Sequence, residues 1–288
     1  MSLLALVLVL AAACAHAAWN VIAHGASRAG LPFLWLGALA SGVVWLPIVP
    51  LTGGIGTDDW SGFLLGITVS AVLHVVYMLV LQRGYAAGNL STVYATARGS
   101  GPLVTVIVAV LALGERPSPI ALVGVIAVIT GVVWIGLLDR GRRPSERRGM
   151  DPAIVFGLLT GLAIAAYTLW DSQSLRVWHI SPVAFMVGCT LIEVVLFGAI
   201  LGRRWREVVP LARLQWRRLL AFGVLSPLSY ILVLAATTIA PVSLVAPTRE
   251  VSVVLVSLFG AFVLREGRPG LRIGASIVVM AGIALLAL

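Results

Sequence analysis

Residues 139–151, DRGRRPSERRGMD, form the longest polar stretch of the sequence and divide the chain almost in half. Apolar segments of about 20 residues lie on both sides of it, and a helix of that length crosses the roughly 30 Å of hydrocarbon in a bilayer. The segments before it are 3–24, 31–51, 61–82, 90–113 and 119–138, and those after it are 152–172, 181–201, 218–238, 242–264 and 270–288. The sequence therefore predicts an all-α polytopic membrane protein with ten transmembrane helices.

The composition excludes other classes of protein. Of the 288 residues, 60% are hydrophobic and only 11% are charged, with a mean hydropathy of +1.06, whereas soluble domains carry about 25% charged residues. Continuous apolar runs without alternation also exclude a transmembrane β-barrel. The formal charge of +9 comes with arginine as the only strongly basic residue, mostly in short runs between apolar segments. That arrangement is typical of cytoplasmic loops and not of a nucleic-acid interface.

The two halves of the chain resemble each other. Sliding the second half back by 151 residues places Arg249 on Arg98 and Glu266 on Glu115 without a gap. Each half holds an odd number of crossings, so the two copies must have opposite orientations in the membrane. We therefore expect two inverted five-helix repeats, residues 1–138 and 152–288, joined by the linker 139–151. In transporters built this way, the substrate site lies near the midplane between the repeats.

The arginines also predict an orientation. Sixteen of them lie in the linker and in the other loops that follow odd-numbered segments, against Arg116 and Arg176 on the opposite side. Because loops rich in Arg stay in the cytoplasm, the linker is expected in the cytoplasm and both termini outside. The expected location is the bacterial inner (plasma) membrane.

Five short motifs carry a resemblance to a known family. The motifs are HAAWN (16–20), STVYATARG (91–99), GERP (114–117), YTLWD (167–171) and APTRE (246–250). With them the sequence resembles the EamA-type ten-helix permeases of the drug/metabolite transporter superfamily over nearly its whole length. Members of this family are usually drawn with both termini in the cytoplasm, which is opposite to the orientation that the arginines predict.

The resemblance implies a permease and not an enzyme. It implies alternating access at a midplane site for a small polar or anionic metabolite, with efflux as the direction and no cofactor or metal. A flippase or carrier for a lipid-linked or nucleotide-linked sugar is the alternative. The expected partners are the small-molecule substrate and the bilayer, without nucleic acid. The sequence contains no HExxH metal motif and no GxSxG nucleophile elbow.

Four of the charged residues inside the apolar segments are expected to need a partner or a water-filled cavity. Each costs about 2.5–3.5 kcal/mol at the bilayer centre unless it has a partner or faces water. Pro102 follows Arg98 and Pro247 precedes Arg249, so helix breaks are expected near both arginines, and matching breaks point to a binding site. Either the arginines hold a carboxylate or phosphate of the cargo, or they form static pairs, Arg249 with Glu193 for example. These residues are Arg98, Glu193, Arg249 and Glu250.

Further polar residues share helix faces at i,i+3 or i,i+4. They can line the same cavity, but each can also be a packed or buried side chain, and Tyr230 fits packing better than a site. Asp171, Glu193 and Glu250 are deep enough to carry protons. Glu115 and Glu266 occupy equivalent turns, where they either cap the next helix and pair with Arg116 and Arg268, or form a gate. The face-sharing candidates are His16 with Trp19 and Asn20, His74 with Tyr77, Tyr94 with Arg98, and Tyr167 with Asp171.

Overall fold

The computed structural model describes residues 1–23, 29–87, 90–138, 151–263 and 269–288. Its long helices in the first half are α1 (Leu3–Ala23), α2 (Leu31–Trp45), α3 (Trp60–Ala87), α4 (Leu90–Leu111) and α5 (Pro119–Leu138). The second half contains α6 (Pro152–Trp178), α7 (Pro182–Leu201), α8 (Trp205–Ile239), α9 (Val242–Thr248), α10 (Val251–Phe262) and α11 (Pro269–Ala287). Short 3₁₀ turns cover Leu46–Ile48, Pro50–Thr52 and Gly202–Arg204.

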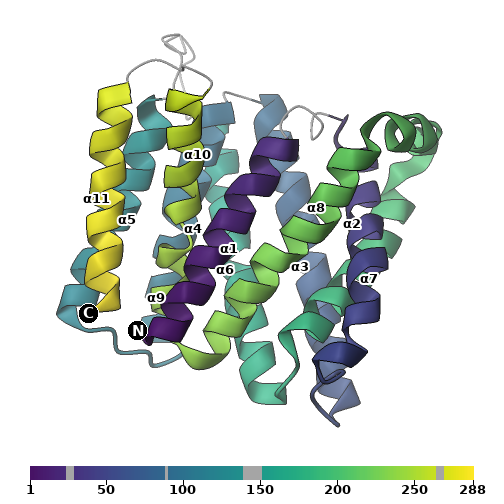
Figure 1. Ribbon diagram of the computed structural model, residues 1–288, viewed down its shortest axis with the longest axis horizontal. Coiled ribbons are helices and arrows are strands. Elements are labelled where there is room, and N and C mark those ends of the chain that lie inside the picture. The colour runs from purple at the N-terminus through teal and green to yellow at the C-terminus, as the bar shows by residue number, and fades with distance from the viewer. Residues whose placement is uncertain (24–28, 88–89, 139–150, 264–268) are drawn as a thin grey trace.

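The helices form a bundle, in which α11, α10, α1 and α8 lie in front of α5, α4, α6 and α3 in the view of Figure 1. Within the described residues, nine stretches are long and apolar enough to cross a membrane, and one of these, Pro182–Ile239, contains both α7 and α8. The stretch Val242–Phe259 joins α9 to most of α10. Ten crossings result when α7 and α8 are counted separately, which confirms the predicted all-helical membrane protein. Both termini lie at the same end of the molecule, as an even number of crossings requires (Figure 1).

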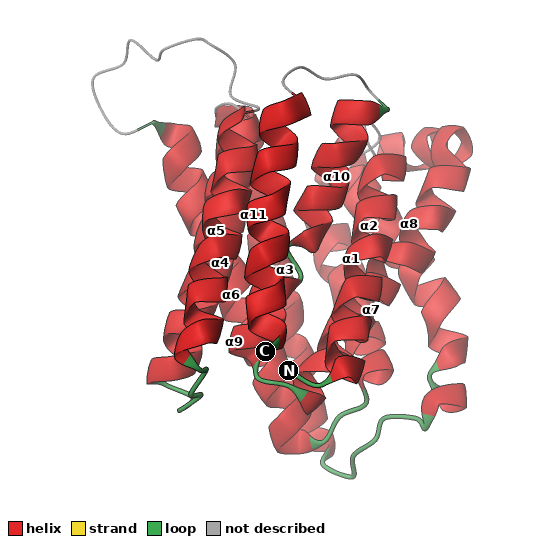
Figure 2. Cartoon of the chain, turned by 60° about the vertical axis from the view of Figure 1, so that its left-hand side comes forward, coloured by secondary structure: helices red, strands yellow, loops and turns green. Residues whose placement is uncertain are grey.

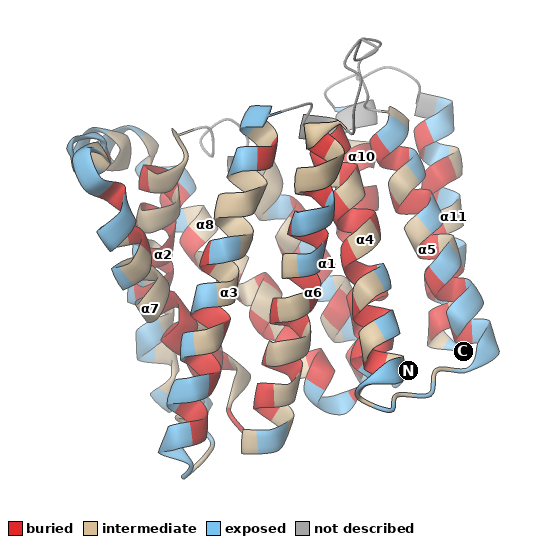
Figure 3. Cartoon of the chain, turned by 180° about the vertical axis from the view of Figure 1, so that it is seen from behind, coloured by how far each residue is buried: buried red, intermediate tan, exposed pale blue. Residues whose placement is uncertain are grey.

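The outer surface of the helix bundle is apolar. α3 and α5 carry large exposed hydrophobic side chains, among them Leu64, Val76 and Ile126. Exposed segments are visible along both helices in Figure 3. In water such a surface would drive aggregation, whereas in a bilayer it meets lipid chains. The exposed apolar faces therefore agree with a protein that is solvated by lipid.

The helix contacts repeat under exchange of the two halves. The α1–α8 contact corresponds to α6–α3, the α2–α8 contact to α7–α3, and the α4–α6 contact to the packing of α9 and α10 on α1. The α5–α11 and α2–α7 contacts correspond to themselves. Such pairing is what a pseudo-two-fold axis in the membrane plane produces, and it agrees with the predicted inverted repeats.

Glycines let α5 and α11 approach closely at this pseudo-symmetric contact. A Cβ atom on Gly124 would lie 2.7 Å from the Gly282 carbonyl oxygen, and one on Gly282 would lie 2.7 Å from the Gly124 carbonyl oxygen. A Cβ atom on Gly131 would meet Val279 Cγ2 at 2.5 Å and the Ala275 carbonyl oxygen at 3.0 Å. Small residues that bring backbones together are the usual means of helix association in lipid.

We expect the substitution Gly131→Ala to lower the free energy of unfolding by about 1–3 kcal/mol, because an added methyl group has no room at this contact. The matched control is Gly270→Ala in the first turn of α11, where a Cβ atom would have no neighbour within 4 Å. Unfolding of the detergent-solubilised variants in an SDS titration measures both effects. Equal stability of the two variants would contradict the close packing of α5 on α11.

The prediction of a helix break near Arg98 and Pro102 is wrong. α4 runs continuously from Leu90 to Leu111 with Pro102 inside it. Pro102 removes one backbone hydrogen bond, but α4 packs so tightly on α6 that Cβ atoms on Gly157 or Gly161 would clash with Thr96 or Ser100. α4 therefore continues through the proline while it keeps this close contact with α6.

The second expected break is present. α9 ends at Thr248 and α10 starts at Val251, so that Arg249 and Glu250 form a turn between two helices (Figure 2). Pro247 lies in the last turn of α9, directly before the interruption. The break therefore occurs in the second repeat only, and it places two charged residues at the point where the helix is interrupted.

α8 begins at Trp205 and not near residue 218. Its first part extends across the end of the molecule that is opposite the termini, and the helix bends at Gln215, where φ is −116° and ψ is 15° (Figure 1). Arg204 pairs with Glu207 there at 2.8 Å. Hydropathy does not detect this part because it mixes Arg with Trp and Leu, a composition typical of a helix at the membrane–water interface.

Candidate functional site

A buried ion pair joins the two repeats. Arg98 of α4 contacts Glu250 of the α9–α10 turn, with 3.3 Å between Arg98 Nη1 and Glu250 Oε1. The two residues are only 8% and 1% exposed. Because the partners come from different repeats, any movement of one repeat against the other acts on this pair.

Two more candidates surround the Arg98 guanidinium. Arg98 Nη2 donates to His16 Nε2 of α1 at 2.8 Å, and the Tyr94 ring centroid lies 5.3 Å from the guanidinium carbon. Since arginine can only donate hydrogen bonds, the His16 Nε2 atom accepts, which places the His16 proton on Nδ1 and leaves the imidazole neutral. α1, α4 and the α9–α10 turn thus meet at one polar centre.

Arg249 lies beside this centre without a partner of its own. It is 8% exposed and its Nε atom has no hydrogen-bond partner, and no ion pair to Arg249 is formed within the described residues. The guanidinium is close enough to interact electrostatically with Tyr167, Glu250, Arg98 and Tyr230. The alternative static pair between Arg249 and Glu193 is therefore absent, and Glu193 on α7 likewise has no ion pair in the part of the chain that the structure describes.

Aromatic rings from α3, α6 and α8 form a second group next to Arg249. His74 stacks on Tyr167 with 4.2 Å between ring centroids, while Tyr77 and Tyr230 meet Tyr167 edge-on at 5.5 and 5.9 Å. The Tyr230 hydroxyl donates to Asp171 Oδ2 at 2.5 Å. The structure thus brings together the predicted pairs His74–Tyr77 and Tyr167–Asp171.

The three candidate residues on α1, His16, Trp19 and Asn20, make different contacts. Trp19 packs edge-on against His16 at 4.9 Å and against Phe222 of α8 at 5.1 Å. Asn20 Nδ2 instead donates to the His16 carbonyl oxygen one turn back, at 2.8 Å. His16 and Trp19 therefore belong to the polar centre and its edge, while Asn20 makes a local backbone contact.

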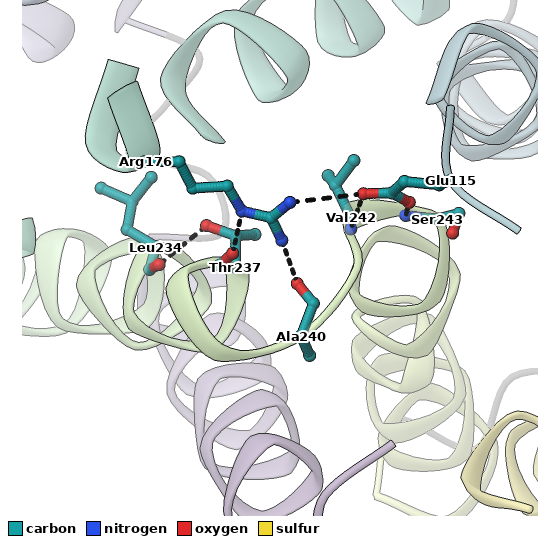
Figure 4. Close-up of polar contacts among 7 residues, drawn as sticks. All are labelled: Glu115, Arg176, Leu234, Thr237, Ala240, Val242 and Ser243. Atoms are coloured by element: carbon teal, nitrogen blue, oxygen red, sulfur yellow. Dashed lines mark hydrogen bonds and ion pairs between the residues drawn. The ribbon is translucent and has the colours of Figure 1, made fainter. Parts of the chain in front are cut away.

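Glu115 makes the contacts that sequence reasoning missed. Its two carboxylate oxygens each accept from a backbone N–H at the start of α9, one from Val242 and one from Ser243, both at 2.9 Å (Figure 4). Arg176 of α6 lies 3.6 Å from Glu115 and donates to the carbonyl oxygens of Thr237 at 2.8 Å and Ala240 at 2.5 Å (Figure 4). We call this arrangement the Glu115–Arg176 lock.

The Glu115–Arg176 lock replaces the local role expected for Glu115. The capping of the following helix α5 and the pairing with Arg116 are both absent, because the carboxylate reaches across to the other repeat. The lock ties the turn after α4 to the end of α8 and the start of α9, at the end of the molecule where the termini lie. Glu266 and Arg268 lie outside the described residues. The sequence did single out the GE turn that contains Glu115. It could not predict what Glu115 contacts, because those residues are distant in the chain.

Comparison with known proteins assigns the family. The profile described as the EamA-like transporter family matches residues 3–137 and 151–288, which is nearly the whole chain in two repeats. A solved structure titled "Crystal structure of protein" covers 98% of this chain and 98% of its own, with a TM-score of 0.73 and 18% identity, and therefore shows the same fold. No curated protein sequence matches the chain. The chain belongs to the EamA-like transporter family and is a multi-pass membrane transporter of the drug/metabolite type.

Proposed function

We propose that the protein exports a small polar or anionic metabolite by alternating access at the polar centre between the two repeats. The Arg249 guanidinium is the observation that supports this most directly. It is buried at a helix break and forms no ion pair with the described residues, because the Glu250 carboxylate beside it contacts Arg98 of the other repeat. A cation in the membrane interior needs a counter-charge, and a carboxylate or phosphate of the cargo supplies it as a charge-assisted, bidentate hydrogen bond.

The aromatic group beside Arg249 gives this site a second property. His74, Tyr77, Tyr167 and Tyr230 offer ring faces and polar edges within one cluster. Small-molecule sites combine such apolar walls with a few fixed polar groups. The cargo is therefore a small anion with an apolar part that packs on these rings.

The Glu115–Arg176 lock supports the alternating-access part of the proposal. It holds the two repeats together at the end of the molecule where the termini lie. Cargo can therefore pass through this end only when Glu115 separates from Arg176 and from the start of α9. In transporters built from inverted repeats, access alternates by rocking of one repeat or bundle against the other.

Flux measurements in proteoliposomes test the site. We expect purified protein to move at least one member of a panel of L-amino acids, small carboxylates and phosphorylated sugars, and Arg249→Gln to reduce that flux at least tenfold. Arg217→Gln is the matched control, since Arg217 is exposed on α8 and contacts only the Trp216 ring among the described side chains. Full flux in Arg249→Gln would refute the anion site. Movement of lipid-linked or nucleotide-linked sugars alone would favour the alternative carrier.

The arginine distribution predicts the orientation of the protein. Described arginines after odd-numbered crossings, such as Arg83, Arg203 and Arg272, lie at the end opposite the termini. We therefore expect a C-terminal epitope tag to be accessible to antibody added outside intact spheroplasts. A tag that becomes accessible only after lysis would reverse the orientation and place the Glu115–Arg176 lock at the cytoplasmic end.

A further inference from the structure

The Asp171 carboxyl in α6 is buried and only partly satisfied. Asp171 is 0% exposed, its Oδ2 atom accepts from the Tyr230 hydroxyl at 2.5 Å, and its Oδ1 atom has no hydrogen-bond partner. The Ser70 hydroxyl of α3 interacts with this carboxyl and also lies 3.3 Å from His74 Nδ1. Neutral hydroxyl groups are therefore the hydrogen-bonding neighbours that the described residues offer to this buried carboxyl.

No cation compensates this carboxyl within the described residues. None of the ion pairs includes Asp171. Arg98 pairs with Glu250, and Arg249 interacts with Tyr167, Glu250 and Tyr230. His74 is held by the Ser70 carbonyl oxygen at 3.0 Å and by stacking on Tyr167. The titratable groups that interact with Asp171 are Tyr230 from α8 and Cys189 and Glu193 from α7. His74 from α3, Tyr167 from α6 and Arg249 from the α9–α10 turn come next, since each of them interacts with Tyr230.

Glu193 is a second acidic residue near Asp171. It lies one helix away on α7, interacts electrostatically with Asp171 and has no ion pair of its own among the described residues. Two carboxylates that share a site cannot both be ionised at low cost. An isolated carboxylate buried away from water takes up a proton instead of remaining charged.

We propose that Asp171 is the proton-binding site of the transporter and that cargo movement is coupled to protonation of this carboxyl. This inference rests on the proposed transport function, but its first test does not. In the conformation described, Asp171 is the neutral acid, with Oδ2 held by Tyr230. When the repeats separate and water reaches α6, the carboxyl releases its proton to that side. The Tyr230 hydroxyl and the His74–Tyr167 stack link the proton site to the region beside Arg249.

Infrared difference spectroscopy tests the protonation directly. Purified protein in phosphatidylcholine nanodiscs, titrated through neutral pH in H₂O and D₂O, is expected to show the carbonyl band of a protonated carboxyl group. Asp171→Asn removes the Asp171 component of this band, Glu193→Gln leaves that component in place, and Glu207→Gln, which alters an exposed carboxyl, changes nothing. Tyr230→Phe retains the acid and moves the Asp171 component to higher wavenumber because the hydrogen bond is lost. If no component disappears in Asp171→Asn, or none moves in Tyr230→Phe, the assignment is overturned.

Coupling is tested in proteoliposomes that contain the pH-sensitive dye pyranine. Addition of a panel compound that the wild type moves is expected to change the lumenal pH, and Asp171→Asn is expected to abolish this change. If cargo moves in the wild type without a lumenal pH change, proton coupling fails while the permease function stands. If no panel compound moves, the permease function lacks support, and the infrared measurement still decides the protonation of Asp171.

Discussion

Replacing Arg98 with methionine is expected to lower the free energy of unfolding by about 3–5 kcal/mol and to abolish transport. The loss of stability follows because the substitution leaves the Glu250 carboxylate buried without its cation. His16 Nε2 loses its donor at the same time. SDS titration measures the stability, and the flux assay measures transport at equal protein content.

The double variant Arg98→Met, Glu250→Met separates stability from function. Replacing both members of a buried ion pair with apolar residues of similar volume is often neutral or stabilising, so we expect stability close to that of the wild type. Transport is expected to stay absent, because the double variant removes both charges from the polar centre at which we propose that cargo binds. If the double variant restores flux along with stability, the pair is a static lock between helices and takes no part in transport.

The exposed pair Arg204–Glu207 provides the matched control for this experiment. It has a shorter separation, 2.8 Å, than the buried pair, but its side chains are 42% and 52% exposed. Solvent-exposed pairs contribute little to stability, and the hydrogen bond from Arg204 Nη2 to the Ala29 carbonyl oxygen at 2.7 Å contributes about 1.5 kcal/mol. Arg204→Met is therefore expected to lower stability much less than Arg98→Met does and to leave flux unchanged. A loss comparable to that of Arg98→Met would mean that any arginine substitution harms this protein.

Most of the fold followed from the sequence because lipid leaves few choices. Backbone groups in hydrocarbon must be satisfied within a helix, so apolar length alone identified the crossings, and the bounds of α1, α5 and α7 agree within a few residues. The errors occurred where hydropathy carries no information. The polar start of α8 is helical although it is not apolar, and Pro102 is accommodated because glycines of α6 pack against α4.

The site was harder to predict because its contacts are distant in the chain. Helical spacing gathered His16 with Trp19 and Tyr94 with Arg98, and both pairs do meet. Spacing could not show that Arg98 pairs with Glu250 across the repeats, nor that Tyr230 is the partner of Asp171. The first contact depends on how one repeat packs on the other, and the second depends on how α8 packs on α6 within the second repeat.

The Glu115–Arg176 lock is expected to control access from the terminal end. In Glu115→Gln only the amide oxygen can accept from the start of α9, so one of the two backbone N–H groups of Val242 and Ser243 faces an amide donor. Hydrogen bonds to a charged group contribute about 1.5–3 kcal/mol, and 1.4 kcal/mol corresponds to a factor of ten. The fraction of molecules open at this end should therefore rise by about ten- to a hundredfold.

A cysteine at Thr248 reports this opening. Thr248 is 0% exposed and lies in α9 between the lock and Arg249. In a background with Cys14 and Cys189 replaced by alanine, Thr248→Cys is expected to react slowly with a membrane-impermeant maleimide. Adding Glu115→Gln should raise this reaction rate about ten- to a hundredfold. The increase should occur only when the maleimide is on the side of the termini.

Two comparisons decide whether the lock acts as a unit. Arg176→Gln removes the bonds to Thr237 and Ala240 and should raise the labelling rate of the cysteine as Glu115→Gln does. Because the two side chains contact each other, the double variant should raise the rate by less than the product of the single effects. Glu207→Gln, at the opposite end, should leave it unchanged. If the substitutions loosen the protein in general, the labelling rate rises in all variants and with the maleimide on either side of the membrane. If the lock is a gate, the rate rises only in the Glu115 and Arg176 variants and only with the maleimide on the side of the termini.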